Sequence, residues 1–163
     1  MTLVELNALD RADFIKAVGW VFEHSLWVAE QVCDGRPYPI LEVLHQVMVN
    51  QVETAPPVRQ LALLRAHPDL GTRARISAPS TAEQSGAGLD RLTPEEFERL
   101  RRLNSAYRDK FGFPFLFAVK GSTKYDILQA LEHRIQAPPD AERREALRQV
   151  YRIAEFRLRD TIK

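Results

Sequence analysis

His67 combines a residue type and a position that suit proton transfer. It lies in the stretch Ala66-His-Pro-Asp-Leu-Gly71, where Pro68 restricts the backbone of the residue before it and disfavours helix there. A histidine side chain gains and loses a proton near neutral pH, as general acid–base catalysis requires. The alternative is structural, because a histidine at a helix end is also favourably placed on the negative end of the helix dipole.

A second polar group, Ser80-Thr-Ala-Glu-Gln84, precedes the glycine-containing stretch Ser85-Gly-Ala-Gly88. Ser80 and Glu83 have the spacing of a capping box, which predicts a helix beginning at Ser80 and gives both residues a structural role. The alternative is a ligand site, because backbone amides of the glycine stretch can approach a ligand and a helix N-terminus favours an anion.

Arg157 is the third unusual residue. On a predicted last helix it follows Val150 by seven residues and Ile153 by four, so it projects into the apolar sector of that helix. A guanidinium that faces inward needs a carboxylate, carbonyl groups or an anionic ligand. The position therefore predicts either a salt bridge to a neighbouring helix or a role in binding a substrate.

Other chemical motifs are missing from the sequence. It has no glycine-rich phosphate loop and no His-Glu-x-x-His, and Glu42-x-x-His45 is one half of a di-iron pattern without its companion helix. Four scattered histidines and the single Cys33 predict no metal site and allow no internal disulfide.

Composition excludes two classes of partner. The 23 basic side chains nearly balance the 22 acidic ones, so the net charge of +1 predicts no nucleic-acid binding. The densest apolar run, residues 113–119, is far shorter than the roughly 20 residues of a membrane-spanning helix. Because Glu5 and Asp10 interrupt the N-terminal stretch, no signal peptide is expected, and we predict a cytoplasmic protein.

Helices must position these side chains. The chain has 163 residues, which favours one domain over residues 1–163. Residues that typically begin, end or interrupt a helix divide the chain into helical segments. In chain order they are Asp10, Gly35–Pro39, Pro56–Pro57, Pro68, Thr93–Glu96, Gly112, Ser122 or Thr123, and Pro138–Asp140. The first of these helices is expected to carry Phe14, Val18, Val21 and Phe22 on one side. Residues 113–119 are the only strand candidate, and Pro114 weakens it. The predicted class is all-α, a single compact domain of about seven or eight helices.

The chain resembles the 2-oxo-4-hydroxy-4-carboxy-5-ureidoimidazoline (OHCU) decarboxylase family along nearly its whole length. The segments that carry the resemblance are Phe22-Glu-His-Ser25 with Trp27, Arg65-Ala-His-Pro-Asp-Leu-Gly71, Ser80-Thr-Ala-Glu-Gln-Ser-Gly-Ala-Gly-Leu-Asp90, Leu103-Asn-Ser-Ala-Tyr-Arg-Asp-Lys-Phe-Gly-Phe-Pro-Phe115, Ala118-Val-Lys-Gly121 and Arg152-Ile-Ala-Glu-Phe-Arg-Leu-Arg-Asp160. Leu26 and Ser122 depart from the family pattern, which has proline at the first position and often a basic residue at the second.

The resemblance implies a reaction of urate degradation. The substrate, an unstable carboxylated ureidoimidazoline, loses its carboxylate as carbon dioxide, and the carbon left behind is protonated on one face to give (S)-allantoin. The resemblance implies no cofactor, because the imidazoline ring can delocalise the charge. It is also compatible with a homodimer.

The resemblance further implies a role for each site residue. His67 is the expected catalytic acid/base, and Glu83 is expected to orient the ligand and help set the proton inventory. Ser80 and Gln84 would hydrogen-bond the ureido or ring groups, and Arg157 would hold an anionic or carbonyl part of the substrate. Pro68 would line the pocket, and an apolar wall with backbone contacts would come from Phe115, Leu116, Phe117, Ala118 and Val119.

Two alternative functions stay open at this level. The first is a decarboxylase that forms a Schiff base on a lysine, for which desolvation of Lys120 beside the apolar run would be needed. The second is a non-enzymatic, all-α protein-binding module, for which the aromatic cluster between Phe111 and Phe117 would have to be exposed.

Overall fold

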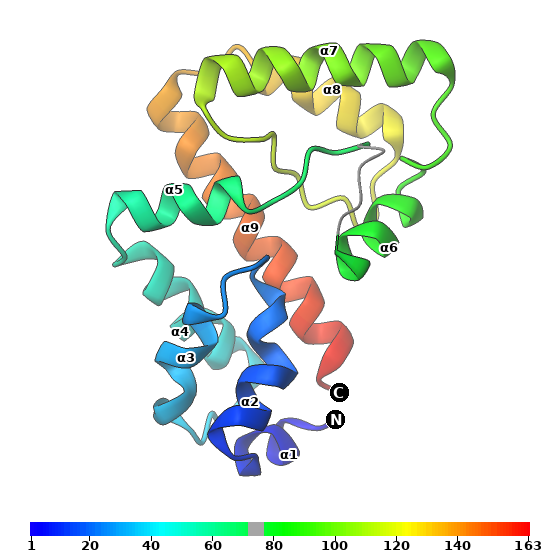
Figure 1. The fold of residues 1–163 in the computed structure, drawn as a ribbon. Coiled ribbons are helices and arrows are strands. Elements are labelled where there is room, and N and C mark those ends of the chain that lie inside the picture. Colours follow the sequence, from blue (N-terminus) through cyan, green and yellow to red (C-terminus); the bar gives the residue numbers. More distant parts are fainter. Residues whose placement is uncertain (72–76) are drawn as a thin grey trace. The chain divides into compact units, whose positions relative to one another are not determined.

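A computed structural model describes residues 1–71 and 77–163. Within these ranges the chain forms nine α-helices and two short 3-10 helices and contains no strand, so the predicted all-α class is confirmed. The α-helices are α1 (Leu3–Ala8), α2 (Arg11–Val18), α3 (Trp27–Val32), α4 (Leu41–Glu53), α5 (Pro57–Arg65), α6 (Ala78–Gly86), α7 (Pro94–Phe111), α8 (Lys124–Arg134) and α9 (Pro139–Thr161), and the 3-10 helices are η1 (Gly19–Val21) and η2 (Cys33–Gly35) (Figure 1).

Local capping signals set most of the helix starts. Asp10 caps α2, while Thr93 and Thr123 form capping boxes with Glu96 and Asp126 at the starts of α7 and α8. Helix α7 ends at Gly112, whose φ of 79° is left-handed and therefore favours glycine. These boundaries agree with the sequence predictions, because each depends on residues only a few positions apart.

The N-terminal region differs from the prediction. The helix expected to continue through Phe22 ends at Val18 and gives way to η1, although Phe14, Val18, Val21 and Phe22 all remain buried. The two six-residue helices α1 and α3 were not predicted. Helix α3 has no side-chain cap at its start, which explains why no sequence signal marks it.

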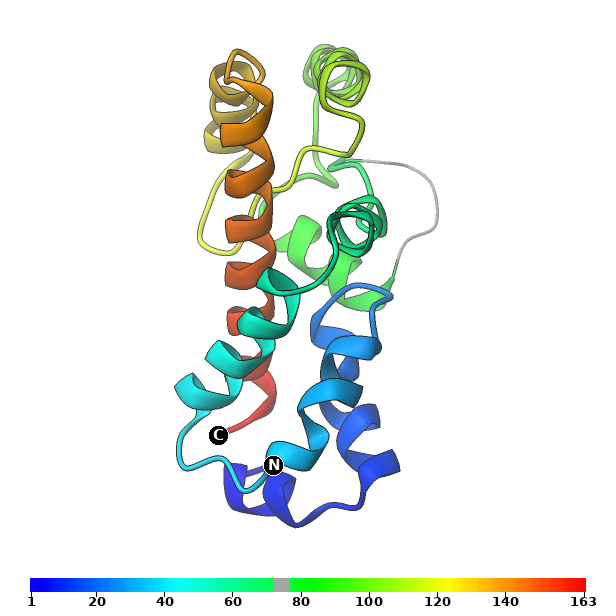
Figure 2. The same ribbon diagram turned by 90° about the vertical axis from the view of Figure 1, so that its left-hand side faces the viewer.

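The chain folds into two compact units, which are described separately. The first unit comprises residues 1–66 and 150–163. Its fully buried residues include Leu6, Phe14, Leu44 and Met48. The two ends of the chain meet here: the Lys163 amide donates to the Met1 carbonyl at 2.9 Å, and Figure 2 shows both termini at the same end of this unit.

The second unit comprises residues 67–149 and contains α6, α7, α8 and the start of α9. Helices α7 and α8 pack against each other. The ring of Tyr107 on α7 packs edge-on against Phe113 and Phe115, with ring centroids 5.9 and 5.4 Å apart. Phe113 and Phe115 are buried, so the exposed aromatic cluster that a protein-binding module would require is not found.

No helix in the two described ranges is both long and apolar enough to cross a membrane. Residues 113–119, the one candidate strand of the sequence, form neither helix nor strand. Their side chains are nevertheless almost all buried. This buried irregular segment contains the five residues that were predicted to form the apolar wall of the site.

Candidate active site

His67 follows directly after a helix end. Helix α5 stops at Arg65 with Ala66 as its C-cap, as the Pro68 signal predicts. The His67 side chain is only 6% exposed. A largely buried histidine on non-helical backbone is a suitable proton donor or acceptor, because the surrounding protein limits competition from water.

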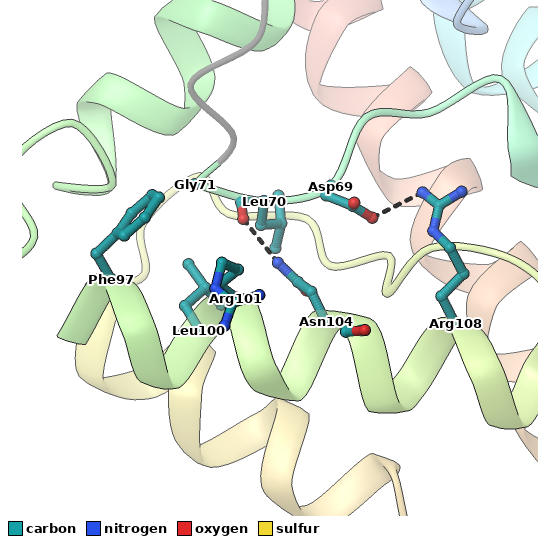
Figure 3. A pocket seen from close by; sticks show the side chains of 9 residues that line it. Asp69, Leu70, Gly71, Phe97, Leu100, Arg101, Asn104 and Arg108 are labelled. Atoms are coloured by element: carbon teal, nitrogen blue, oxygen red, sulfur yellow. Dashed lines mark hydrogen bonds and ion pairs between the residues drawn. The ribbon is translucent and has the colours of Figure 1, made fainter. Parts of the chain in front are cut away.

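Three side chains anchor the residues that follow His67, and two of them, Asn104 and Arg108, are drawn in Figure 3. Arg108 Nη2 lies 2.8 Å from Asp69 Oδ1, and Asn104 Nδ2 donates to the Leu70 carbonyl at 2.9 Å. The Gly71 amide donates to Gln84 Oε1 at 2.8 Å. Three consecutive residues are thus tied to α7 and α6, so the chain next to His67 has a defined position.

Gly71 needs to be glycine for two reasons. Its φ of 71° is left-handed, and a Cβ built there would lie 2.4 Å from Leu100 Cδ2. The close approach of this backbone to α7 therefore depends on the missing side chain.

The predicted capping box at Ser80 and Glu83 is wrong. The N-cap of α6 lies three residues earlier, at Ser77, whose side chain accepts a hydrogen bond from the Ser80 amide at 3.4 Å, and the helix begins at Ala78. Pro79 is compatible with this start, because the first turn of a helix needs no amide donor there. The N-cap of α6 is therefore Ser77 and not Ser80.

Ser80, Glu83 and Gln84 share one face of α6, since residues three and four apart on a helix are neighbours. Ser80 and Gln84 are buried, and Glu83 is half-buried. Gln84 accepts from the Gly71 amide through Oε1, so its Nε2 group is the part that can donate to a ligand. The structure thus adds an anchoring role that the sequence did not predict for Gln84.

Residues 115–119, which were predicted to form an apolar wall, belong to the second unit. Phe115, Leu116, Ala118 and Val119 are buried and Phe117 is half-buried, with the rings of Phe115 and Phe117 stacked at 6.0 Å. Three backbone groups of the wall already have protein partners: the Leu116 carbonyl accepts from Arg134 Nη1 at 2.5 Å, the Ala118 amide donates to Gln149 Oε1 at 2.9 Å, and the Val119 carbonyl accepts from the Ser122 amide at 2.9 Å. Backbone contacts with a ligand would have to use the other groups of this segment.

Arg157, in the first unit, faces inward as predicted and is 3% exposed. Its Nη1 lies 2.9 Å from Glu23 Oε2 and 3.3 Å from the carbonyl oxygens of Trp20 and Val21. The salt bridge is therefore present, but its partner follows η1 and does not lie on a neighbouring helix.

Glu23 was not singled out by sequence reasoning. The sequence offered one signal, the place of Glu23 in the Phe22-Glu-His-Ser25 segment that carries the family resemblance. The structure adds a second, because the neighbouring His24 has a left-handed φ of 48°. Such a backbone conformation is uncommon in a residue other than glycine and often marks a functional or constrained position.

A separate pocket of about 330 Å³ lies between residues 69–71 and the face of α7 that runs from Phe97 to Arg108 (Figure 3). None of the predicted site residues lines it. Its wall includes Asn104 and Arg108, which anchor the His67 segment. This pocket therefore lies beside the side chains that hold the His67 segment on α7, apart from the predicted site residues.

Two further observations bear on the chemistry. No group of three or more metal-ligating side chains occurs within residues 1–71 and 77–163. Lys120 is exposed, so the desolvation that a Schiff-base lysine requires is missing at this residue. The predicted site residues offer instead a histidine, a carboxylate and neutral hydrogen-bonding groups.

Comparison with known proteins identifies close relatives. A family model described as OHCU decarboxylase matches residues 7–159. The 2-oxo-4-hydroxy-4-carboxy-5-ureidoimidazoline decarboxylase of Halalkalicoccus jeotgali is 45% identical over 160 residues, which cover 98% of this chain and 91% of that protein. The uric acid degradation bifunctional protein PucL of Bacillus subtilis is 44% identical, over 99% of this chain but only 33% of its own length.

The fold also matches solved structures. A crystal structure of (S)-allantoin synthase superposes with a TM-score of 0.82 at 34% sequence identity, covering 99% of this chain and 54% of that one.

Proposed function

The chain belongs to the OHCU decarboxylase family, and from this membership we propose that it converts 2-oxo-4-hydroxy-4-carboxy-5-ureidoimidazoline to (S)-allantoin and carbon dioxide. The observation that carries the proposal is the match over residues 7–159, which includes the anchored segment bearing the buried His67. The reaction belongs to urate degradation and uses no cofactor.

The reaction breaks the bond between the ring carbon and its carboxylate. Carbon dioxide leaves, and the electron pair of that bond passes into the imidazoline ring. The ring nitrogen that receives the electron pair takes up a proton, so the reaction consumes one proton overall. The hydroxyl on the same carbon loses its proton as it becomes a carbonyl, and the neighbouring ring carbon gains a proton to become the stereocentre. We assign these proton transfers to His67, working through the substrate hydroxyl.

The residues of α6 orient the substrate in this proposal. Glu83 holds the ligand and helps set the number of available protons, and Ser80 offers a hydroxyl to the ureido or ring groups. Because Gln84 Oε1 is engaged by Gly71, its Nε2 donates to an oxygen of the substrate. Supply of the proton to one face requires such fixed orientation.

Apolar residues complete the proposed site. Pro68 and residues 115–119 exclude water from the carboxylate, which favours its loss as neutral carbon dioxide. Arg157 is assigned to an anionic or carbonyl part of the substrate. We also propose a homodimer, from the family resemblance, and a cytoplasmic location, from the absence of a predicted signal peptide or membrane-spanning run in the sequence.

A coupled circular-dichroism assay tests the proposed function. Urate is oxidised and hydrolysed in place to supply fresh substrate, with and without the protein. Rapid growth of the (S)-allantoin signal above the slow, racemic background is the expected result. A folded protein that leaves the decay of confirmed substrate unchanged would overturn the proposal and favour the binding-module alternative.

A further inference from the structure

A buried charged network lies in the second unit, outside the residues assigned to the reaction. Glu142 on α9 is 1% exposed and Arg134 on α8 is 8% exposed. Arg134 Nε and Nη2 donate to Glu142 Oε1 at 2.8 and 2.5 Å, and the Tyr107 hydroxyl donates to the same oxygen at 2.5 Å. Three helices thus meet at one carboxylate oxygen.

This network is a costly way to hold helices together. Removing two charges from water carries a desolvation penalty that often exceeds their attraction, and apolar residues of similar size commonly serve stability as well or better. Burial, with the Glu142 carboxylate beside it, raises the pKa of Tyr107, so the phenol stays protonated and remains a donor. A buried ion pair is therefore weak evidence of a role in stability, and another role deserves a test.

The network is connected to the apolar wall at two points. Arg134 Nη1 donates to the Leu116 carbonyl at 2.5 Å, and the guanidinium carbon lies 4.6 Å from the centre of the Phe115 ring. Residues 113–119 form neither helix nor strand, so they lack the regular backbone hydrogen bonds of those elements, and the Leu116 carbonyl and the Ala118 amide pair with side chains instead. Arg134 supplies one of these bonds at the middle of the wall.

We propose that Arg134 and Glu142 are positioning residues for the reaction: Glu142 orients the guanidinium fork, and Arg134 fixes the shape of residues 115–119 against which the substrate is held. The inference rests on the proposed function, which places the substrate beside this wall. The planar fork suits the task, because it can donate to Glu142 and to Leu116 in fixed directions at once.

The test is the double variant Arg134→Met/Glu142→Gln, assayed by circular dichroism across substrate concentrations and by thermal unfolding. It removes both charges while the glutamine oxygen can still accept from Tyr107. We expect the variant to remain folded and kcat/KM to fall by about 10²-fold, mainly through KM, as displacements of the order of 1 Å can cost this much. Wild-type KM and kcat in the folded variant would overturn the inference.

Two single variants keep the test decisive if the double variant does not fold. Arg134→Lys retains the positive charge but loses the fork, so KM is expected to rise even where the thermal midpoint is preserved; an unchanged KM would contradict the inference. Tyr107→Phe removes only the hydroxyl and leaves the bond to Leu116 in place. It is expected to lower the thermal midpoint without changing KM. A rise in KM as large as that of Arg134→Lys would show that KM follows the stability of the network, and it would overturn the positioning role.

The matched control is the exposed ion pair of Arg99 on α7 and Glu132 on α8, with 3.0 Å between Arg99 Nε and Glu132 Oε1. Arg99→Met/Glu132→Gln should leave KM unchanged. A rise in KM as large as that of Arg134→Met/Glu142→Gln would overturn the specific role of the buried pair. Wild-type protein is measured first. If it forms no (S)-allantoin, the proposed function fails and takes this inference with it, whereas an active wild type with unaffected variants removes the inference alone.

Discussion

Gln84 on α6 accepts a hydrogen bond from the backbone amide of Gly71, at 2.8 Å. This bond joins the helix that carries Ser80 and Glu83 to the loop that carries His67. The residues assigned to proton transfer and to substrate orientation are therefore held by one another, as well as by the helices on which they lie.

Two variants of Gln84 separate its anchoring role from its proposed contact with substrate. Gln84→Glu keeps an oxygen for the Gly71 amide but replaces the proposed donor with a negative charge facing an anionic substrate. We expect an unchanged thermal midpoint and a loss of kcat/KM of about 10- to 100-fold, the range of a lost hydrogen bond to a charged group. Gln84→Leu should lower both quantities. Full activity in Gln84→Glu would remove the substrate contact.

His67→Gln tests the acid/base assignment. Turnover should fall by about 10²–10⁴-fold, the usual contribution of a general acid–base group. The measurement is the rate of (S)-allantoin formation by circular dichroism, with folding checked by thermal unfolding. His133→Gln, at an exposed position on α8, is the control and should match the wild type. A fully active His67→Gln protein would exclude this histidine from the chemistry.

Glu83→Gln is expected to reduce turnover without reducing stability. The cap of α6 is Ser77, so the neutral side chain at position 83 disturbs no capping bond. We expect a loss of about 10²-fold in turnover, at the lower end for a group that acts on protons. Glu98→Gln on the exposed surface of α7 is the control. The opposite pattern, a lower thermal midpoint with normal turnover, would return Glu83 to a structural role.

Arg157 requires a double variant, because it forms a buried ion pair with Glu23. Arg157→Leu alone should cost about 3–5 kcal/mol in the free energy of unfolding, since a buried carboxylate loses its cation. Arg157→Leu/Glu23→Leu should recover most of that loss in a urea titration. If Arg157 binds substrate, activity will not return with stability. Recovery of both would show that the arginine serves the fold alone.

The sequence by itself determined the family, the helical class and many helix boundaries. Asp10, Thr93 and Thr123 cap helices as predicted, and α5 ends before Pro68. These features are readable because a cap or a proline acts on residues three or four positions away. The family match rests on motifs spread over residues 7–159 and needs no coordinates.

Only the tertiary structure decided which partners the polar site residues take. Gly71 and Gln84 are 13 residues apart, Leu70 and Asn104 are 34 apart, and Val21 and Arg157 are 136 apart. The start of α6 was mispredicted because Ser77 and Ser80 are both good caps, and local pattern alone does not choose between them. Likewise, an inward-facing arginine in the sequence indicates that an acceptor must lie near it, but it does not identify that acceptor. The fold brings Glu23 to Arg157 and the Leu116 carbonyl to Arg134. A buried guanidinium is cut off from water, so it can bond only to the acceptors that pack against it.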